Sequence, residues 1–205
     1  MAHLNIPKHV AYAKRCLSLM PANFQGVDLN RMSIGFFLIN SLDLLNSLNT
    51  TTTKQDRLQW IDWIYRCQLP AGGFRGSTAT ITDPSSVFDT AHIPGTYFAL
   101  ATLLILGDDL KRVRRREILD GLRKTQYEDG SFAPVLLGDG DKFGELDVRH
   151  VYCAIAVRDI LSPIAKEEDI DVPATIRYIQ QCKVSPATDF AYDRIMMGDM
   201  HRVRN

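Results

Sequence analysis

Apolar and polar positions along this chain define two kinds of helix. Some segments are apolar around most of their circumference, which is typical of a helix buried on most sides; they are residues 31–45, 90–106 and 147–161. The segments between them are amphipathic, with apolar residues at helical spacing and charged residues opposite; they are residues 54–68, 114–126 and 175–182. Buried and amphipathic helices therefore alternate. This order predicts an inner and an outer helical layer, as in an α/α barrel or toroid.

A repeated turn motif sets the spacing of these helices. Gln68 and Gln126 each end an amphipathic segment, and each begins the pattern Gln-x-x-x-Gly-x-Phe, 58 residues apart. The segment ending at Cys182 closes at about the same interval. Self-similarity at a long fixed period indicates repeated supersecondary units. The turn glycines, Gly72–Gly73 and Gly130, supply the positive φ that often follows a helix end.

Local signals at the helix starts agree with an all-α fold. Thr52 or Thr53 can cap the helix that follows, and Gln55 or Asp56 can complete a capping box. Pro173 suits the first turn of a helix, where its missing N–H costs nothing. No run alternates with period two for long enough to predict a strand. We therefore predict the all-α class.

Three helix pairs, with one more helix near residues 7–20, make only a partial arc of such a toroid. In a closed toroid each inner helix is flanked on both sides. An arc has two unpaired edges that expose apolar surface, which monomeric soluble proteins seldom carry in large patches. Two explanations stay open: the arc packs on a partner, or the sequence is a fragment of a longer protein.

Composition narrows the class of partner and the compartment. The 24 basic and 24 acidic residues cancel, so there is no electrostatic footprint for nucleic acid. The basic cluster at residues 112–116 is interpreted as a solvated helix start, with an anion site as the alternative. Four cysteines without a C-x-x-C pair indicate reduced core thiols. We expect a cytoplasmic protein that is not an integral membrane protein, because no apolar stretch is long enough to span a bilayer.

Several motifs together resemble the protein prenyltransferase β subunits, whose fold is an α/α barrel. Within that family the chain is most similar to the type I protein geranylgeranyltransferase β subunit, over its N-terminal half. The resemblance covers residues 5–182, and residues 183–205 form a divergent tail. The motifs that carry it are Arg31-Met32-Ser33-Ile34-Gly35-Phe36-Phe37, Gly73-Phe74-Arg75-Gly76-Ser77, Ala91-His92-Ile93 with Thr96-Tyr97, Ile105-Leu106-Gly107-Asp108-Asp109-Leu110, Glu128-Asp129-Gly130-Ser131-Phe132 and Asp147-Val148-Arg149-His150-Val151-Tyr152-Cys153-Ala154.

The resemblance implies a lipid site. Related farnesyltransferases have a tryptophan where this chain has Ser33, and the smaller residue leaves room for a 20-carbon chain. Tyr97, Arg149, Tyr152 and Cys153 match residues that line the lipid tunnel, and the last three share one helix face. The residues alone allow a different interpretation: Ser33 is a small residue at a close helix crossing, and Arg149 contacts Asp147 or a carbonyl for structure only.

The resemblance also implies a site for the last residue of a protein substrate, at Ser33, His92, Pro94 and His150. The family usually has a small residue at the position of Pro94 and an aromatic one at that of His150. A histidine there is more polar and titrates near neutral pH, which puts the usual preference for a terminal leucine in question. Taken alone, His92 is interpreted as a core histidine with satisfied hydrogen bonds.

The catalytic metal of the family is absent from the matching region. The resemblance implies that zinc is held by an aspartate, a cysteine and a histidine of the C-terminal half, so we assign no metal ligand and no catalytic residue in this chain. Asp89 with His92, and Asp147 with His150, form Asp-x-x-His pairs, which are a weak metal signal. The tail lacks the third glycine turn, which predicts a truncated β subunit.

Two hypotheses follow. In the first, the chain is a β subunit of a heterodimeric geranylgeranyltransferase type I, a transferase that pairs with an α subunit. The resemblance implies geranylgeranyl diphosphate as substrate, and as targets proteins that end in Cys-a-a-Leu, such as small GTPases. In the second, it is a non-catalytic helical repeat module that binds a partner through its exposed inner wall. A triterpene-cyclase-like enzyme is disfavoured because the chain lacks an aspartate-rich acid motif.

Overall fold

The structure is a computed structural model that describes residues 4–19, 22–80, 89–138, 140–161 and 170–183. Most of these residues lie in helices. The elements, in chain order, are α1 (Ile6–Ser18), η1 (Ala22–Asn30), α2 (Arg31–Leu44), α3 (Leu48–Thr51), α4 (Lys54–Arg66), η2 (Thr78–Thr80), α5 (Ile93–Ile105), α6 (Arg115–Thr125), β1 (Val135–Leu136), β2 (Lys142–Phe143), α7 (Val148–Leu161) and α8 (Val172–Gln181).

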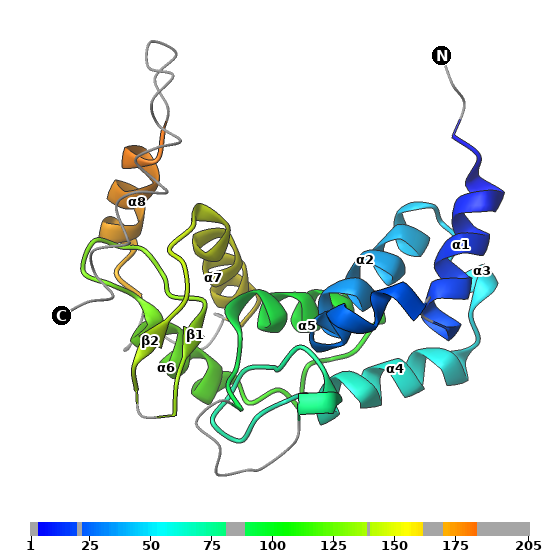
Figure 1. Cartoon of the computed structure of the whole chain (residues 1–205), viewed down its shortest axis with the longest axis horizontal. Coiled ribbons are helices and arrows are strands. Elements are labelled where there is room, and N and C mark those ends of the chain that lie inside the picture. The colour runs from blue at the N-terminus through cyan, green and yellow to red at the C-terminus, as the bar shows by residue number, and fades with distance from the viewer. Residues whose placement is uncertain (1–3, 20–21, 81–88, 139, 162–169, 184–205) are drawn as a thin grey trace.

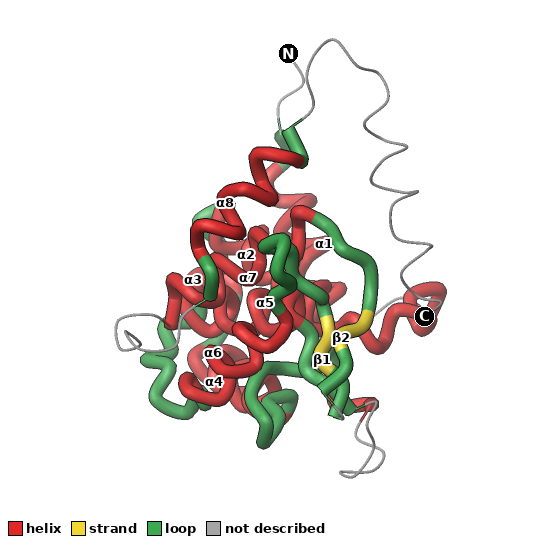
Figure 2. The backbone as a smooth tube through the Cα atoms, turned by 90° about the vertical axis from the view of Figure 1, so that its left-hand side faces the viewer, coloured by secondary structure: helices red, strands yellow, loops and turns green. Residues whose placement is uncertain are grey.

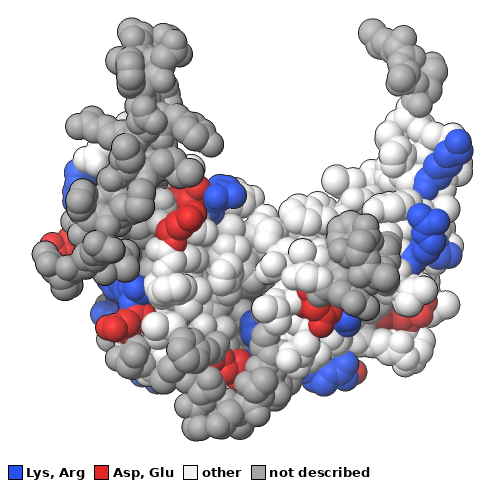
Figure 3. Space-filling view, viewed as in Figure 1, with Lys and Arg blue, Asp and Glu red and all other residues white. Residues whose placement is uncertain are grey.

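The helices form a curved two-layer arc (Figure 1). The space-filling view from the same side shows a hollow on the concave side of this arc (Figure 3). The inner layer consists of α2, α5 and α7, with α2 packed along α5 and α5 along α7. In the outer layer α4 packs against α5, and α6 against α7. Figure 2 shows α4 and α6 together on one side of the inner helices. The predicted all-α fold with alternating inner and outer helices is confirmed.

Local sequence accounts for where these helices begin. In the capping box that opens α4, the Asp56 N–H donates to Thr53 Oγ1 at 3.0 Å, and the Thr53 N–H donates to Asp56 Oδ2 at 2.8 Å. Pro173 lies in the first turn of α8, as predicted. That helix starts at Val172 rather than Thr175, because the Asp171 side chain accepts from the Ala174 N–H at 2.8 Å and caps an earlier turn.

The repeated glutamine joins each outer helix to the next. The Gln68 amide donates to the Arg112 carbonyl at 3.1 Å and accepts from the Arg114 N–H at 2.8 Å. Gln126 does the same with Asp171, donating to its carbonyl at 3.0 Å and accepting from its N–H at 2.7 Å. Each glutamine therefore satisfies backbone groups just before the next outer helix. The repeat seen in the sequence is a repeated docking contact.

The repeated glycine allows each turn to approach the next outer helix closely. Gly72 and Gly130 both have positive φ, at 93° and 91°. A Cβ on Gly72 would lie 2.5 Å from the Glu117 carbonyl carbon, and one on Gly130 would lie 2.2 Å from the Ala174 carbonyl carbon and oxygen. Only glycine lets the turn touch the backbone of the next outer helix.

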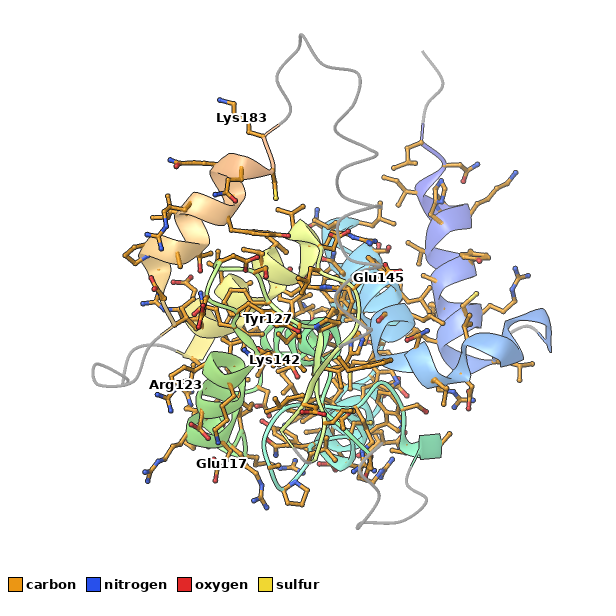
Figure 4. The ribbon with its side chains drawn as sticks, turned by 60° about the vertical axis from the view of Figure 1, so that its left-hand side comes forward. Glu117, Arg123, Tyr127, Lys142, Glu145 and Lys183 are labelled. Atoms are coloured by element: carbon orange, nitrogen blue, oxygen red, sulfur yellow. The ribbon has the colours of Figure 1, made fainter. Side chains whose placement is uncertain are left out.

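A short hairpin interrupts the all-helical pattern. β1 and β2 are two residues each and antiparallel, with Val135 opposite Phe143 and Leu136 opposite Lys142. Two residues are too few to show an alternating period, so these strands could not be predicted from the sequence pattern. The Lys142 ammonium lies 4.4 Å from the centre of the Tyr127 ring and donates to the Gln126 carbonyl (Figure 4). The hairpin is thereby attached to the second repeat turn.

The main core lies between the two layers. It gathers fully buried side chains from inner helices, such as Leu100 and Val157, and from α6, such as Leu122. A smaller cluster joins α1 to α2. All four cysteines are free, and only Cys182 is more than slightly exposed. In the described part of the chain no helix is long and apolar enough to cross a membrane.

Candidate functional site

Five aromatic side chains gather on the inner layer, and we call them the aromatic wall: Phe36, Phe37, Tyr97, Phe98 and Tyr152. Neighbouring ring centres are 4.9–6.0 Å apart. Tilted and edge-on pairs at such distances are favourable arrangements of aromatic rings. The wall spans α2, α5 and α7, so it exists only because three inner helices lie side by side.

The aromatic wall is partly open to solvent. Phe37 is 58% exposed and Tyr152 is 60% exposed, whereas Phe36 is buried beneath them. Figure 3 shows that the hollow is largely free of charged side chains on the visible face. An exposed apolar surface of this kind favours an apolar ligand, because binding removes the surface from water.

One hydrogen bond orients the two tyrosines of the wall. The Tyr97 and Tyr152 hydroxyls are 3.1 Å apart, and the ring centres are 5.4 Å apart. Burial, followed by this hydrogen bond, raises the pKa of Tyr97 to about 12. The Tyr97 phenol is therefore protonated at neutral pH. The hydroxyl groups of Tyr97 and Tyr152 form a polar edge of the aromatic wall, where each can donate or accept a hydrogen bond.

Ser33 lies on α2, three and four residues before Phe36 and Phe37, and is partly buried. Residues at this spacing occupy the same side of a helix. The serine therefore borders the aromatic wall at its α2 end. Because its side chain is small, Ser33 fills little of the space beside this end of the aromatic wall.

Arg149 differs from the expectation of a buried arginine. Its side chain is 78% exposed. Nε and Nη2 donate to the two Asp147 carboxylate oxygens, at 2.9 and 3.0 Å. These hydrogen bonds lower the pKa of Asp147. The aspartate two residues earlier gives the guanidinium a partner at the surface, so the side chain has no need of the helix interior.

Cys153, next to Tyr152 on α7, is buried. Burial raises the pKa of its thiol to about 11. It is therefore a neutral thiol at physiological pH and packs as a small apolar side chain. Of the predicted lipid-site residues, the structure brings together Tyr97, Tyr152 and Cys153, and it leaves Arg149 at the rim.

Three of the residues predicted for peptide recognition mark the ends of inner helices. His92 directly precedes α5, Pro94 is in the first turn of α5, and His150 is in the first turn of α7. Loss of surrounding water lowers the pKa of both histidines, and the charge of His150 lowers that of His92 further. His150 Nδ1 is buried without a hydrogen-bond partner. The two imidazoles thus influence each other, and His150 keeps one ring nitrogen available for a hydrogen bond.

The aspartates of the two Asp-x-x-His pairs have other partners. Asp89 forms a buried ion pair with Arg75 at 2.8 Å, and Asp147 pairs with Arg149. Within the described ranges, no group of three or more histidine, cysteine, aspartate or glutamate side chains could hold a metal ion. These residues do not fit a zinc site, and we derive no step through zinc.

Phe36, Phe37 and Phe98 belong to the aromatic wall although the sequence predicted only Tyr97 of the two aromatic doublets as a site residue. Phe36-Phe37 and Tyr97-Phe98 lie at the same level of two successive inner helices, and their rings meet. The available signal was an adjacent aromatic pair within each of two largely apolar helices. In a helix, adjacent residues point about 100° apart. One ring of a doublet can therefore be buried while the other faces the hollow, as Phe36 and Phe37 do.

A two-layer α/α toroid with an apolar hollow is the class that this fold and site define. The family of prenyltransferase alpha-alpha toroid domains matches residues 4–187. The chain belongs to this family. The predicted resemblance to type I geranylgeranyltransferase β subunits is confirmed by the relatives described next.

The chain is 31% identical to the geranylgeranyl transferase type-1 subunit beta of Dictyostelium discoideum, over 97% of this chain and 59% of that protein. It is 26% identical to the corresponding subunit of Arabidopsis thaliana, over 89% of this chain and 49% of that protein. A protein farnesyltransferase subunit beta of Arabidopsis thaliana is 28% identical over 79% of this chain. The chain spans about half the length of the type-1 relatives.

A solved structure shares the fold. The structure described as Candida albicans protein geranylgeranyltransferase-I complexed with GGPP superposes with a TM-score of 0.76 and 28% identity. The match covers 87% of this chain and 51% of that one. It extends the likeness from sequence to the arrangement of the helices.

Proposed function

We propose that the chain is the lipid- and peptide-binding part of a β subunit of protein geranylgeranyltransferase type I. The whole enzyme would transfer a 20-carbon prenyl group from geranylgeranyl diphosphate to the cysteine of a C-terminal Cys-a-a-Leu motif, as on small GTPases. In this transfer the cysteine sulfur bonds to the first prenyl carbon, the bond from that carbon to oxygen breaks, and diphosphate leaves. An α subunit would complete the enzyme.

The observation that carries this proposal is the exposed aromatic wall on the inner layer of a prenyltransferase toroid. An isoprenoid tail laid on Phe37 and Tyr152 would remove apolar surface from water, at about 25 cal/mol per Å². The relative from Candida albicans is described as a complex with GGPP, a 20-carbon prenyl diphosphate. This chain's own residues would bind and orient the lipid, while the groups for the chemical step would come from elsewhere in the enzyme.

The function is tested by reconstitution. The chain is co-expressed with the prenyltransferase α subunit of the same organism, and the complex receives zinc, labelled geranylgeranyl diphosphate and a peptide ending in Cys-x-x-Leu. We expect transfer to the peptide cysteine only when the β chain also contains the family's C-terminal half. Transfer by a complex of the α subunit with only the 205-residue chain would contradict the assignment of the chemical step to another part of the enzyme.

The preference for one lipid length over another tests more directly whether the aromatic wall binds the lipid. We expect Ser33→Trp to shift binding from geranylgeranyl towards farnesyl diphosphate by about tenfold, because the indole fills the space of the last isoprene unit, a difference of about 1.4 kcal/mol. Gln59→Trp, at an exposed position of the outer helix α4, is the control and should leave the preference unchanged. Binding of both labelled lipids by fluorescence titration provides the measurement.

The alternative function is a helical repeat module that binds a protein partner through the inner wall. The exposed side chains of the wall also support this reading, since such patches serve protein contacts. Under this hypothesis Ser33→Trp only destabilises the fold by overpacking. Equal loss of both lipids, together with a lower unfolding temperature, would favour the module over the transferase subunit.

A further inference from the structure

A second candidate site lies away from the aromatic wall. A cavity of about 840 Å³ is lined by the first repeat turn, α6, the start of α5 and the hairpin region. Its lining includes none of the five aromatic-wall residues, nor Ser33, His92 or His150. The cavity therefore belongs to a different part of the fold. Its size is within the range of small-molecule sites, about 300–1,000 Å³.

Most of the cavity surface is apolar. Side chains from three elements and a turn face it, including Leu69 from the turn, Ile93 from α5, Ile118 and Leu122 from α6, and Val157 from α7. All five are buried in the folded chain. A concave surface of this composition favours the binding of hydrocarbon.

A buried ion pair contributes the polar part of the lining. Arg75 Nη2 and Asp89 Oδ2 are 2.8 Å apart, and the two side chains are only 9% and 8% exposed. Arg75 Nε and Nη1 and Asp89 Oδ1 are buried without hydrogen-bond partners. A buried ion pair is well stabilised only when its remaining donors and acceptors are also satisfied. Two guanidinium nitrogens of Arg75 and one carboxylate oxygen of Asp89 are therefore without hydrogen-bond partners next to the cavity.

The charges around the cavity select against an ionic ligand. Arg75 and Asp89 neutralise each other, and Lys124 faces Asp120 at hydrogen-bonding distance. Glu117 is the remaining charged residue of the lining, and it is exposed on α6 (Figure 4). An anion would meet one uncompensated carboxylate, and a cation would meet the unpartnered guanidinium donors. A neutral polar group meets neither penalty.

We propose that this cavity binds a neutral amphiphile with a carboxamide head. The head's carbonyl oxygen would accept from Arg75 Nε or Nη1, and its N–H would donate to Asp89 Oδ1. The hydrocarbon tail would lie among Ile93, Ile118 and Leu122. This proposal does not rest on the transferase function, because it uses a different cavity and different residues.

The test uses the full chain with octanamide as the probe and octanoate as the charged counterpart. Isothermal titration should show one octanamide per chain, with octanoate at least tenfold weaker. Equal affinity for the two, or no saturable binding of octanamide, would overturn the proposal. Leu137→Trp, at a half-buried position of the lining, should abolish binding while the unfolding temperature stays close to that of the unmodified chain.

The head-group contacts are tested by removing both charges together. Arg75→Met with Asp89→Leu leaves no unpaired buried charge, so the variant is expected to fold, and it should lose the preference for octanamide over octanoate. The matched control is Arg112→Met with Asp62→Leu, an exposed ion pair of 2.7 Å in the same chain. The control should keep the preference. An unchanged preference in the Arg75–Asp89 double variant would contradict the assigned contacts.

Discussion

His92 and His150 show how a position at the end of the inner layer changes the pKa of a single side chain. Both lie at the starts of inner helices, where the ring loses part of its surrounding water, and His150 Nδ1 has no hydrogen-bond partner. Asp147 and the Glu145 carbonyl favour the charged form of His150, whereas burial and Arg149 oppose it, with burial the largest effect. The net result is a lowered pKa for both imidazoles.

This pair predicts a loss of stability in mild acid. The unfolded-state pKa of histidine is about 6.5, so on acidification the unfolded chain takes up protons before the folded chain does. The folded state therefore loses stability as pH falls below about 7. We expect the unfolding temperature to drop between pH 7.5 and 5.5, and to drop less in His150→Gln, when followed by circular dichroism.

His9→Gln is the control for that experiment. His9 is an exposed residue of α1, and its replacement should leave the pH dependence unchanged. If His150→Gln and the unmodified chain lose stability in parallel over this pH range, the burial of His150 is not the cause.

At the scale of elements, the glutamine and the glycine of each repeat turn act together. Gln126 satisfies the N–H and carbonyl of Asp171, and Gly130 lets the turn contact Ala174 one helical turn later. The same geometry recurs at Gln68 and Gly72. The turn motif therefore positions each outer helix against its neighbour. Packing of inner against outer helices then follows from their apolar faces.

Alanine at Gly130 should uncouple α8 from the second turn. The φ of +91° and the 2.2 Å approach of a Cβ to the Ala174 backbone lead us to expect a loss of about 3 kcal/mol in the free energy of unfolding. Gly121→Ala, inside α6 with nothing within 4 Å of the new Cβ, should instead gain about 0.5–1 kcal/mol.

Urea unfolding of the two variants beside the unmodified chain provides the measurement. Each variant adds one methyl group at a glycine, so their difference isolates the backbone contact. Comparable stabilities for the two would show that the turn does not press on α8.

At the scale of the whole molecule, the curvature of the arc decides what remains exposed. α2, α5 and α7 each bury one side against the outer layer and turn another side to the hollow (Figure 1). Aromatic side chains on that second side, such as Phe37 and Tyr152, stay accessible. Sequence apolarity alone would have buried them.

Two adjacent phenylalanines, Phe36 and Phe37, test this difference between the buried and the exposed side of an inner helix. Phe36→Ala removes a buried ring and should lower the free energy of unfolding by about 3 kcal/mol. Phe37→Ala removes a ring that is 58% exposed and should cost about 1 kcal/mol or less, while it weakens binding of an apolar fluorescent dye to the hollow. Urea unfolding and dye titration on the same samples separate the two effects. Equal stability losses would contradict an open wall.

The sequence by itself determined the helices, their alternation and the period of the repeat. These properties are local or nearly so: apolar spacing, capping residues such as Thr53, and a turn pattern repeated at Gln68 and Gln126 all act within a few residues. Helix ends were predicted to within about three residues, because caps compete over that distance. The two-residue hairpin was missed, since its pairing depends on partners outside each strand.

Only the tertiary structure decided which side chains meet and which face solvent. The aromatic wall needs three helices from distant parts of the chain, and the cavity at Arg75 and Asp89 needs a turn, two layers and a hairpin region. Arg149 shows the limit most clearly: its helix is apolar enough to suggest burial, yet Asp147 holds it at the surface. Burial depends on the packing of neighbouring elements, and a sequence period specifies a helix face without specifying what covers it.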